Sequence, residues 1–312
     1  MWSSVFSTLF TMRFLQAIIR LATPIVFAAL GAFTAASTGI GNIAIESIMT
    51  FSALAGVLGS YLFNNAWLGV ICGLAIGILT ALLITFFSMK LGADAFLIMI
   101  ALNTFADSVA IFVLYQLTGD KGTTASLATP ILYTWDIPII KDIPILGEIL
   151  SGQYILTYIC WLLVIIMFIV IYKTPLGMRM RACGLNADAA KTAGINVERL
   201  QVLSLALSGI FAALGGVYLS LNYLKIFSKG MVSGQGWMGV AANGISNGNY
   251  WTLILSGVIF AVFRAVSIIF SSNSAFPTDL VGAIPYFSVF VILTAASIIN
   301  YYRIKRGKVE EH

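Results

Sequence analysis

Long apolar runs alternate with short polar ones along this chain, and each apolar run is continuous over its length. A helix that crosses a bilayer needs about 20 predominantly apolar residues, and stretches of that kind lie at residues 14–36, 67–88, 95–117, 154–172, 200–222, 250–271 and 283–302. Because lipid offers no hydrogen-bond partners to open backbone, each stretch is predicted to be a helix. A β-barrel would show alternating hydrophobicity instead. The pattern therefore predicts an all-α, polytopic integral membrane protein.

Two further apolar segments, residues 41–62 and 230–248, are interrupted by glycines and polar residues. We expect both to be interrupted or re-entrant, which brings the predicted number of membrane helices to about 8–10. Each segment ends in a corner rich in Asn with a Trp: Asn64, Asn65 and Trp67 in the first, and Asn247, Asn249 and Trp251 in the second. Paired interrupted segments in two halves of a transporter point to a translocation site near the midplane of the bilayer.

Composition agrees with this membrane class. Of the 312 residues 60% are hydrophobic and 9% charged, with a mean hydropathy of +0.98, whereas soluble domains carry about 25% charged residues. The net charge is +5, and the cations flank the apolar spans. We therefore expect these charges to orient the chain in the membrane and expect no nucleic-acid partner. The one histidine is His312, and the cysteines Cys72, Cys160 and Cys183 are scattered. We therefore expect no disulfide framework, metal site or cofactor.

The polar stretch 173–199 separates two spans and carries five cations against two anions. Such a basic loop is expected on the cytoplasmic side. Asn186 is a good helix N-cap and Gly194 a good helix stop, while Asn196 can begin a second helix that runs into the next span. We expect one short helix to lie across the base of the membrane domain, where its small residues let a partner approach closely.

Counting spans fixes part of the topology. If residues 173–199 and the basic tail 303–308 share the cytoplasmic side, segment 230–248 must supply a crossing, and residues 118–153 form an extracellular excursion. The chain 1–312 is then one transmembrane domain, without a cleaved signal peptide. Residues 1–62 leave two alternatives. Either Arg13 and Arg20 mark a cytoplasmic N-terminus and segment 41–62 re-enters and returns, or the N-terminus lies outside.

Several polar side chains within the apolar spans are candidates for the solute path. Glu46 could bind solute hydroxyls, or it could cap broken backbone or pair with Arg264. Asn103 and Asp107 lie four residues apart, on one helical face, where they could bind a sugar or join helices. An aromatic ring beside amides suits a sugar or nucleobase, although a Trp can also anchor at the membrane interface. The chosen candidates are Asn42, Glu46, Asn103, Gln235, Trp237 and Asn243.

Three motifs in order resemble one family. GIGNIAIESIM (residues 39–49), GMRMRACGLNADAAKTAGI (177–195) followed by SLALSGIFAALGGVYLS (204–220), and GQGWMGVAANGISNGNYW (234–251) are similar to motifs in permeases of ATP-binding cassette (ABC) importers for ribose-type sugars, nucleosides and branched-chain amino acids. LIMIALN (97–103) looks most like the simple-sugar and nucleoside branch. The resemblance spans about residues 20–300. Two departures are Glu46–Ser47 where Glu-Gly is usual, and Ser246–Tyr250 where a Gly-x-x-x-Pro corner is usual.

This resemblance implies a transport subunit and no enzyme. It implies a second permease copy or a paralogue, separate cytoplasmic ATP-binding subunits, and an extracellular or periplasmic solute-binding protein, all at the plasma membrane. Residues 186–195 would be the coupling helix that enters a groove on the ATPase, with Gly184, Asn186, Ala189, Ala190, Ala193 and Gly194 as its contact residues. The chain has no G-x-x-x-x-G-K-[ST] loop to hold ATP, so hydrolysis would belong to another polypeptide.

Two alternatives to the sugar or nucleoside importer remain open. One is a branched-chain amino acid permease of the same family. The other is a transporter driven by an ion gradient, for which Glu46 and Asp107 could supply an acidic ion site. An intramembrane enzyme is disfavoured, because the chain has no histidine cluster, paired acids or activated nucleophile for such chemistry.

Overall fold

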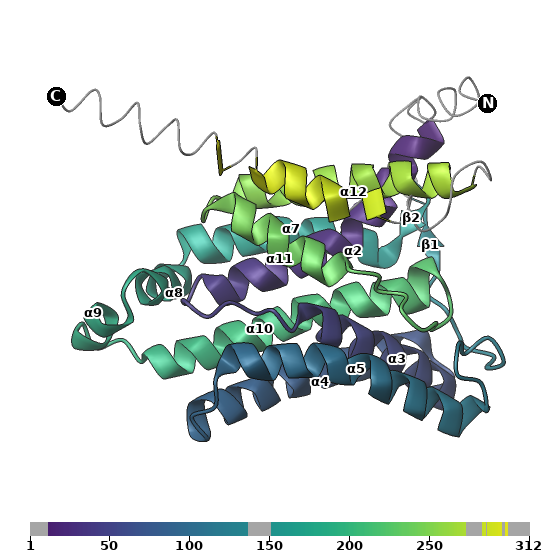
Figure 1. The fold of residues 1–312 in the computed structure, drawn as a ribbon, viewed down its shortest axis with the longest axis horizontal. Coiled ribbons are helices and arrows are strands. Elements are labelled where there is room, and N and C mark those ends of the chain that lie inside the picture. The colour runs from purple at the N-terminus through teal and green to yellow at the C-terminus, as the bar shows by residue number, and fades with distance from the viewer. Residues whose placement is uncertain (1–11, 137–150, 273–282, 285, 295–296, 299–312) are drawn as a thin grey trace.

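The computed structural model describes residues 12–136, 151–272, 283–284, 286–294 and 297–298. Helices account for nearly all of the regular structure in this part of the chain (Figure 1). They are α2 (Met12–Ala36), α3 (Ile45–Phe63), α4 (Ala66–Thr85), α5 (Ala95–Thr118), α7 (Ile155–Lys173), α8 (Pro175–Leu185), α9 (Ala187–Thr192), α10 (Val197–Val217), α11 (Gln235–Ser246) and α12 (Tyr250–Ser272). Two π-helical segments, η1 (Phe86–Lys90) and η2 (Tyr218–Tyr223), continue α4 and α10, and β1 (Thr134–Trp135) pairs antiparallel with β2 (Gln153–Tyr154).

Within the described residues, seven helices are long and apolar enough to cross a membrane. They confirm six of the spans predicted from the sequence, namely those at 14–36, 67–88, 95–117, 154–172, 200–222 and 250–271. The stretch predicted at 283–302 lies partly outside the described residues, and residues 286–294 of it are helical. The protein is an all-α, multi-pass membrane protein, as its hydrophobic pattern predicts.

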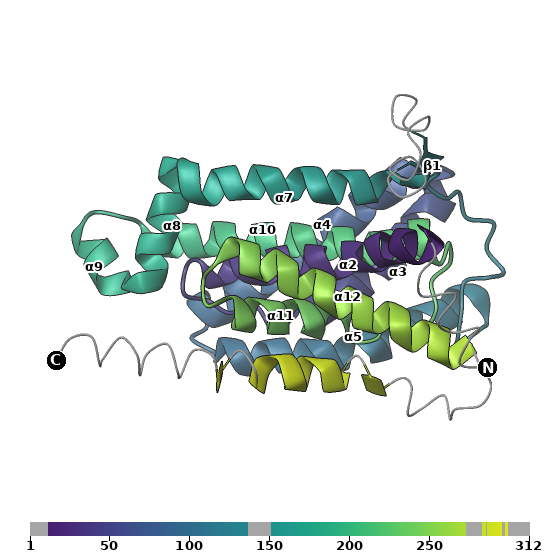
Figure 2. The same ribbon diagram turned by 90° about the horizontal axis from the view of Figure 1, so that it is seen from above.

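The helices lie side by side, with α8 and α9 at one end of the bundle and β1 and β2 at the other (Figures 1 and 2). Helix α2 begins at the β1–β2 end, where the guanidinium of Arg20 donates hydrogen bonds to Gln153 and to the carbonyl of Gly152, both at 3.0 Å. It finishes at the α9 end, where a Cβ atom on Gly184 would lie 2.6 Å from the carbonyl oxygen of Ser37. Residues 37–63 therefore cross back, and the alternative in which 41–62 re-enters and returns is wrong.

Both interrupted segments contain a break followed by a continuous helix. Residues 37–44 and 224–234 are not helical, with an isolated β-bridge between Ser228 and Thr123 in the second stretch, and α3 and α11 begin after them, near the middle of the bundle (Figure 1). The glycines inside α3 do not interrupt it, because they are contact points: a Cβ atom on Gly59 would lie 2.7 Å from the side chain of Cys72 in α4. Within the predicted segments 41–62 and 230–248, the non-helical backbone lies at the start, at residues 41–44 and 230–234, and the glycines within α3 and α11 do not break these helices.

Helices α3 and α11 end in the same type of corner and point in opposite directions. Asn64 and Asn247 end α3 and α11 in the left-handed conformation, with φ of 48° and 46°. The side chains of Asn65 and Asn249 then accept hydrogen bonds from the backbone N–H groups of Trp67 and Trp251, at 2.9 and 3.0 Å. Helix α3 ends at the β1–β2 end and α11 at the α9 end (Figure 1). This is the arrangement of an inverted repeat.

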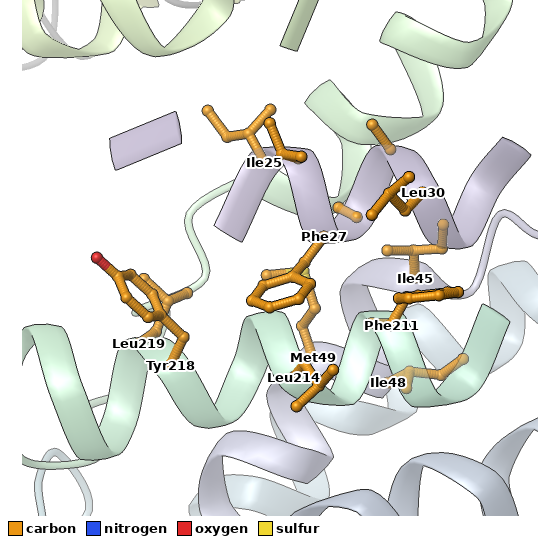
Figure 3. Packing of buried hydrophobic residues seen from close by; sticks show 14 of the residues in the cluster. Ile25, Phe27, Leu30, Ile45, Ile48, Met49, Phe211, Leu214, Tyr218 and Leu219 are labelled. Carbon is orange, nitrogen blue, oxygen red and sulfur yellow. The ribbon is translucent and has the colours of Figure 1, made fainter. Parts of the chain in front are cut away.

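The core lies where α2, α3 and α10 meet. Figure 3 shows Ile25, Phe27 and Leu30 of α2 facing side chains of α3 and of α10 with its η2 extension, and these residues are almost fully buried. Helix association in lipid depends on close packing of small residues, because the lipid itself is apolar. Gly216 in α10 provides such a contact, since a Cβ atom there would overlap the backbone carbonyl of Met49 in α3. The backbones of α3 and α10 thus touch directly.

Replacing Gly216 with Ala should therefore force α3 and α10 apart. Overpacking of a tight core costs about 1–3 kcal/mol, so we expect Gly216→Ala to lower the thermal unfolding midpoint of the detergent-solubilised protein. Gly244→Ala is the matched control, because Gly244 is also helical but a Cβ atom there would meet nothing within 4 Å. Equal midpoints for the two variants would contradict the packing described for Gly216.

Candidate functional site

A single carboxylate connects the starts of α3 and α11 at the centre of the bundle. Glu46 lies in the first turn of α3, and its two oxygens accept hydrogen bonds from the backbone N–H groups of Gly234 and Gly236, both at 2.8 Å. Those two residues begin α11. The positive ends of two helix dipoles therefore meet at one anion, which compensates its charge without a bound cation. We call Glu46, Gly234 and Gly236 the carboxylate clasp.

The backbone that leads into α11 is constrained from the other side as well. Ser233 and Gly234 have positive φ angles of 52° and 76°, and such a conformation in a residue other than glycine carries strain. The carbonyl oxygen of Ser233 accepts hydrogen bonds from Arg264, at 3.3 Å, and from the hydroxyl of Tyr286, at 3.1 Å. Arg264 thus binds the loop beside Glu46. Of the interpretations considered for Glu46, these contacts match the capping of broken backbone.

Two asparagines hold the break before α3. Asn42 is 2% exposed; its amide donates to the hydroxyl of Ser208 in α10 at 2.8 Å, and its oxygen accepts from the N–H of Ala44 at 2.9 Å. Asn103 of α5 accepts from the N–H of Ser47 and donates to the carbonyl of Ile43, both at 3.0 Å. Backbone that leaves a helix inside the membrane needs such partners. Both side chains therefore fix the non-helical backbone in place.

The candidates on α11 lie in two places. Gln235 is 2% exposed, and its Oε1 atom is buried without a hydrogen-bond partner in the part of the chain that the structure describes. Trp237 follows the clasp and is 43% exposed. Asn243 lies nearer the α9 end and lines a cavity of about 420 Å³ together with Arg181 and Gly184. Five of the six predicted path residues thus gather around the start of α3 and α11, and Asn243 does not.

One residue of this region was considered from the sequence but not chosen as a candidate. Asp107 lies one helical turn after Asn103 and is exposed at the middle of α5, as are its neighbours Thr104 and Ser108. In the sequence, the feature that points to Asp107 as a functional residue is its position near the centre of a mostly apolar span, where ionisable groups are rare. Within the described residues, no three His, Cys, Asp or Glu side chains are placed to hold a metal ion.

The short helix between α8 and α10 has the predicted caps. The side chain of Asn186 accepts hydrogen bonds from the N–H groups of Asp188 and Ala189, at 3.1 and 3.0 Å. Gly194 has a φ of 81°, and Asn196 accepts from the N–H of Arg199 at 3.0 Å to begin α10. These local predictions are confirmed, and the result is a short helix, α9, between two sharp bends.

The small residues of this region face different ways. Ala189, Ala193 and Gly194 are exposed, as is Asn186. Ala190 is 4% exposed and packs with Cys183 and Val197, so its side chain fastens α9 to α8 and α10. Gly184 lies against the backbone of Ser37, in the break before α3. A partner at the α9 end would therefore meet Ala189 and Ala193 and would not reach the side chain of Ala190.

Residues 14–294 match the family model for the branched-chain amino acid transport system permease component. The match covers most of the chain, so the protein belongs to this family of membrane permeases. The chain is 28% identical to the nucleoside ABC transporter permease protein NupC of Lactococcus lactis subsp. cremoris over 288 residues, 89% of each chain. It is 30% identical to the guanosine ABC transporter permease protein NupQ of Bacillus subtilis over 284 residues, 88% of each chain.

One solved structure supports the fold. PsaBC from Streptococcus pneumoniae, solved in complex with Fab, contains a chain that superposes with a TM-score of 0.54 at 14% identity, over 95% of both chains. At that identity the likeness concerns the arrangement of helices alone. Together with the seven apolar helices, the family places this chain in the plasma membrane as a multi-pass permease subunit.

Loss of the carboxylate clasp should loosen the start of α11. Glu46→Gln replaces one acceptor oxygen with an NH₂ group that faces a backbone N–H, so one hydrogen bond is lost and the other loses its charge. Hydrogen bonds to charged groups contribute about 1.5–3 kcal/mol each, and we expect the free energy of unfolding to fall by an amount in that range. Thermal unfolding in detergent and faster amide exchange at residues 234–238 would measure it.

Glu198→Gln is the control for that substitution. Glu198 also lies in the first turn of a helix, α10, but it is exposed. Its removal should change the unfolding midpoint little, because dipole effects at exposed sites are a few tenths of a kcal/mol to about 1 kcal/mol. If the two variants unfolded alike, the clasp would not have the role described.

Proposed function

We propose that this chain is the permease subunit of an ATP-driven importer and that its solute is a nucleoside. The observation that carries the proposal is the identity of 28% and 30%, over nearly 90% of each chain, to two permeases named for nucleoside and guanosine transport. The central group is compatible with such a solute, because the indole of Trp237, which is 43% exposed and directly follows Gly236 of the carboxylate clasp in sequence, can pack on a nucleobase. Family membership also favours ATP-driven transport over an ion-gradient mechanism.

In this proposal the α9 end faces the cytoplasm. The loop 173–199 is basic, as expected for a cytoplasmic loop. A separate ATP-binding subunit docks on the exposed side of α9, at Asn186, Ala189, Ala193 and Gly194. A solute-binding protein delivers the nucleoside at the opposite, β1–β2 end, and a second permease subunit completes the assembly. Hydrolysis of ATP belongs to the docked subunit, and this chain provides the path.

The contacts supply a mechanical route from that docking site to the path. Movement of α9 is transmitted to α8, because Ala190 is packed against Cys183. Gly184 of α8 touches the carbonyl of Ser37, so the break at residues 37–44 moves with it. That break leads directly to Glu46 and, through the clasp, to the start of α11. Closure of the ATPase would thus shift α3 and α11 together.

Reconstitution tests this function. The chain, assembled in proteoliposomes with its proposed ATPase and solute-binding protein, should take up radiolabelled guanosine only with ATP. Excess unlabelled guanosine should abolish that uptake, whereas ribose and leucine should leave it nearly unchanged. Uptake that persists without ATP and collapses with a proton uncoupler would contradict the proposal, and competition by leucine would indicate an amino acid permease.

A bulky charged side chain on the exposed side of α9 should uncouple ATP hydrolysis by the ATP-binding subunit from solute uptake through this chain. Ala189→Arg places a long cation where the ATPase is proposed to dock, so we expect ATP-dependent uptake to fall at least ten-fold and less ATPase to co-purify. Ala125→Arg is the control for ATPase co-purification, since Ala125 is also small and exposed but lies in the loop after α5, outside the α8–α10 region. Normal coupling in Ala189→Arg would rule out docking at this surface.

A further inference from the structure

The outward face of α5 carries an ionisable side chain near its middle, among exposed apolar residues such as Phe105 and Phe112. Asp107 is exposed and lies near the midpoint of Ala95–Thr118, with exposed Thr104 and Ser108 close by on the same helix. Helix α7 gives the comparison, because its exposed side chains at similar depth are aliphatic: Leu162, Ile165, Ile166 and Ile169. Ionisable groups inside a membrane face a partner or a water-filled cavity. The exposed residues of α7 therefore suit lipid, whereas the exposed face of α5 includes one group, Asp107, that needs a partner or water.

The carboxylate of Asp107 is available to a ligand. In the described part of the chain it has no hydrogen bond or ion pair, whereas the neighbouring hydroxyls of Thr104 and Ser108 are bonded to carbonyls of their own helix, at 3.3 and 3.5 Å. An ionised carboxylate is an acceptor only, with two oxygens side by side. It is therefore suited to a ligand that offers two neighbouring hydroxyl donors.

Asp107 also belongs spatially to the central site. Asn103, one helical turn before Asp107, is hydrogen-bonded to the backbone of Ser47 and Ile43, on either side of Glu46. In Figures 1 and 2, α5, α11 and the helix at residues 286–294 lie on the face of the bundle opposite α7. Two half-exposed aromatic rings, of Trp237 and Tyr286, lie on elements of that face.

We propose that Asp107 lines the water-filled solute path and accepts hydrogen bonds from the two adjacent ribose hydroxyls of the passing nucleoside. The inference rests on the proposed function and adds the group that distinguishes a ribonucleoside from its 2′-deoxy form. The second permease subunit encloses the path against lipid on this face. The exposed indole of Trp237 offers the apolar surface that a nucleobase can cover.

Exposure to water is tested by thiol labelling in membranes. A cysteine in place of Asp107 should react with a charged, membrane-impermeant methanethiosulfonate reagent well above the wild-type background, and guanosine together with the binding protein should slow the reaction. Ile165→Cys is the matched control, because Ile165 is 56% exposed near the middle of α7 on the opposite face. Equal, slow labelling at both positions would overturn the proposal.

Selectivity is tested in the reconstituted importer with guanosine and 2′-deoxyguanosine. Asp107→Ala should lower guanosine uptake at limiting concentration at least ten-fold more than 2′-deoxyguanosine uptake, since a hydrogen bond to a charged acceptor corresponds to roughly ten-fold or more in affinity. The binding protein is the same in both measurements, so a change in the uptake ratio reports on the permease. Asp107→Glu should retain part of the wild-type ratio.

The outcomes distinguish the role of Asp107 from the proposed function. An unchanged ratio in Asp107→Ala, with active wild-type protein, would overturn the role of Asp107 and leave the nucleoside importer intact. Absence of guanosine uptake by the wild-type assembly would overturn the proposed function itself. If Asp107→Ala fails to assemble, the protection of the cysteine by guanosine decides the question, and absence of protection counts against the proposal.

Discussion

The structure depends on one carboxylate placed where two helices begin. An acid inside an apolar bundle is costly unless its charge is compensated, and the carboxylate of Glu46 accepts hydrogen bonds from backbone N–H groups at the positive ends of two helix dipoles. That arrangement requires both α3 and α11 to start at mid-depth, which in turn requires breaks in the chain before them. The breaks then need partners for their own backbone, and Asn42 and Asn103 supply them. The polar groups at the centre of this protein therefore depend on one another: the carboxylate needs the helix starts, the helix starts need the breaks, and the breaks need the asparagines.

The same polar groups explain why the chain can bend at the centre of the bundle. Elements α2 and α10 pack tightly through small residues and buried side chains, as Figure 3 shows, so they form a rigid frame. The irregular segments at 37–44 and 224–234 are where the chain can bend. One of them touches α8 through Gly184, and the other is tied to Arg264 and Tyr286 through Ser233. In the proposed mechanism, motion enters through the first segment and changes the second.

The sequence predicted the spans, the two breaks and the caps of α9, because these features follow from local pattern. Apolar length marks a membrane helix whatever it packs against, and Asn186 and Gly194 act within one turn of their own position. It did not predict which side chains bond to which. The pairing of Glu46 with residues nearly 190 positions away, and the inward packing of Ala190, depend on how α3, α11 and α8 meet in space. Asp107 was considered from the sequence as a sugar-binding or ion-binding residue but was ranked below Asn103, and only the assembled bundle shows that it is exposed.

The donors in the clasp belong to main-chain groups of glycines, and this has an evolutionary consequence. Side chains along the rest of α11, such as Gln235 and Trp237, can be exchanged without removing either donor. Related permeases could therefore diversify the cargo they accept while inheriting one unaltered hinge.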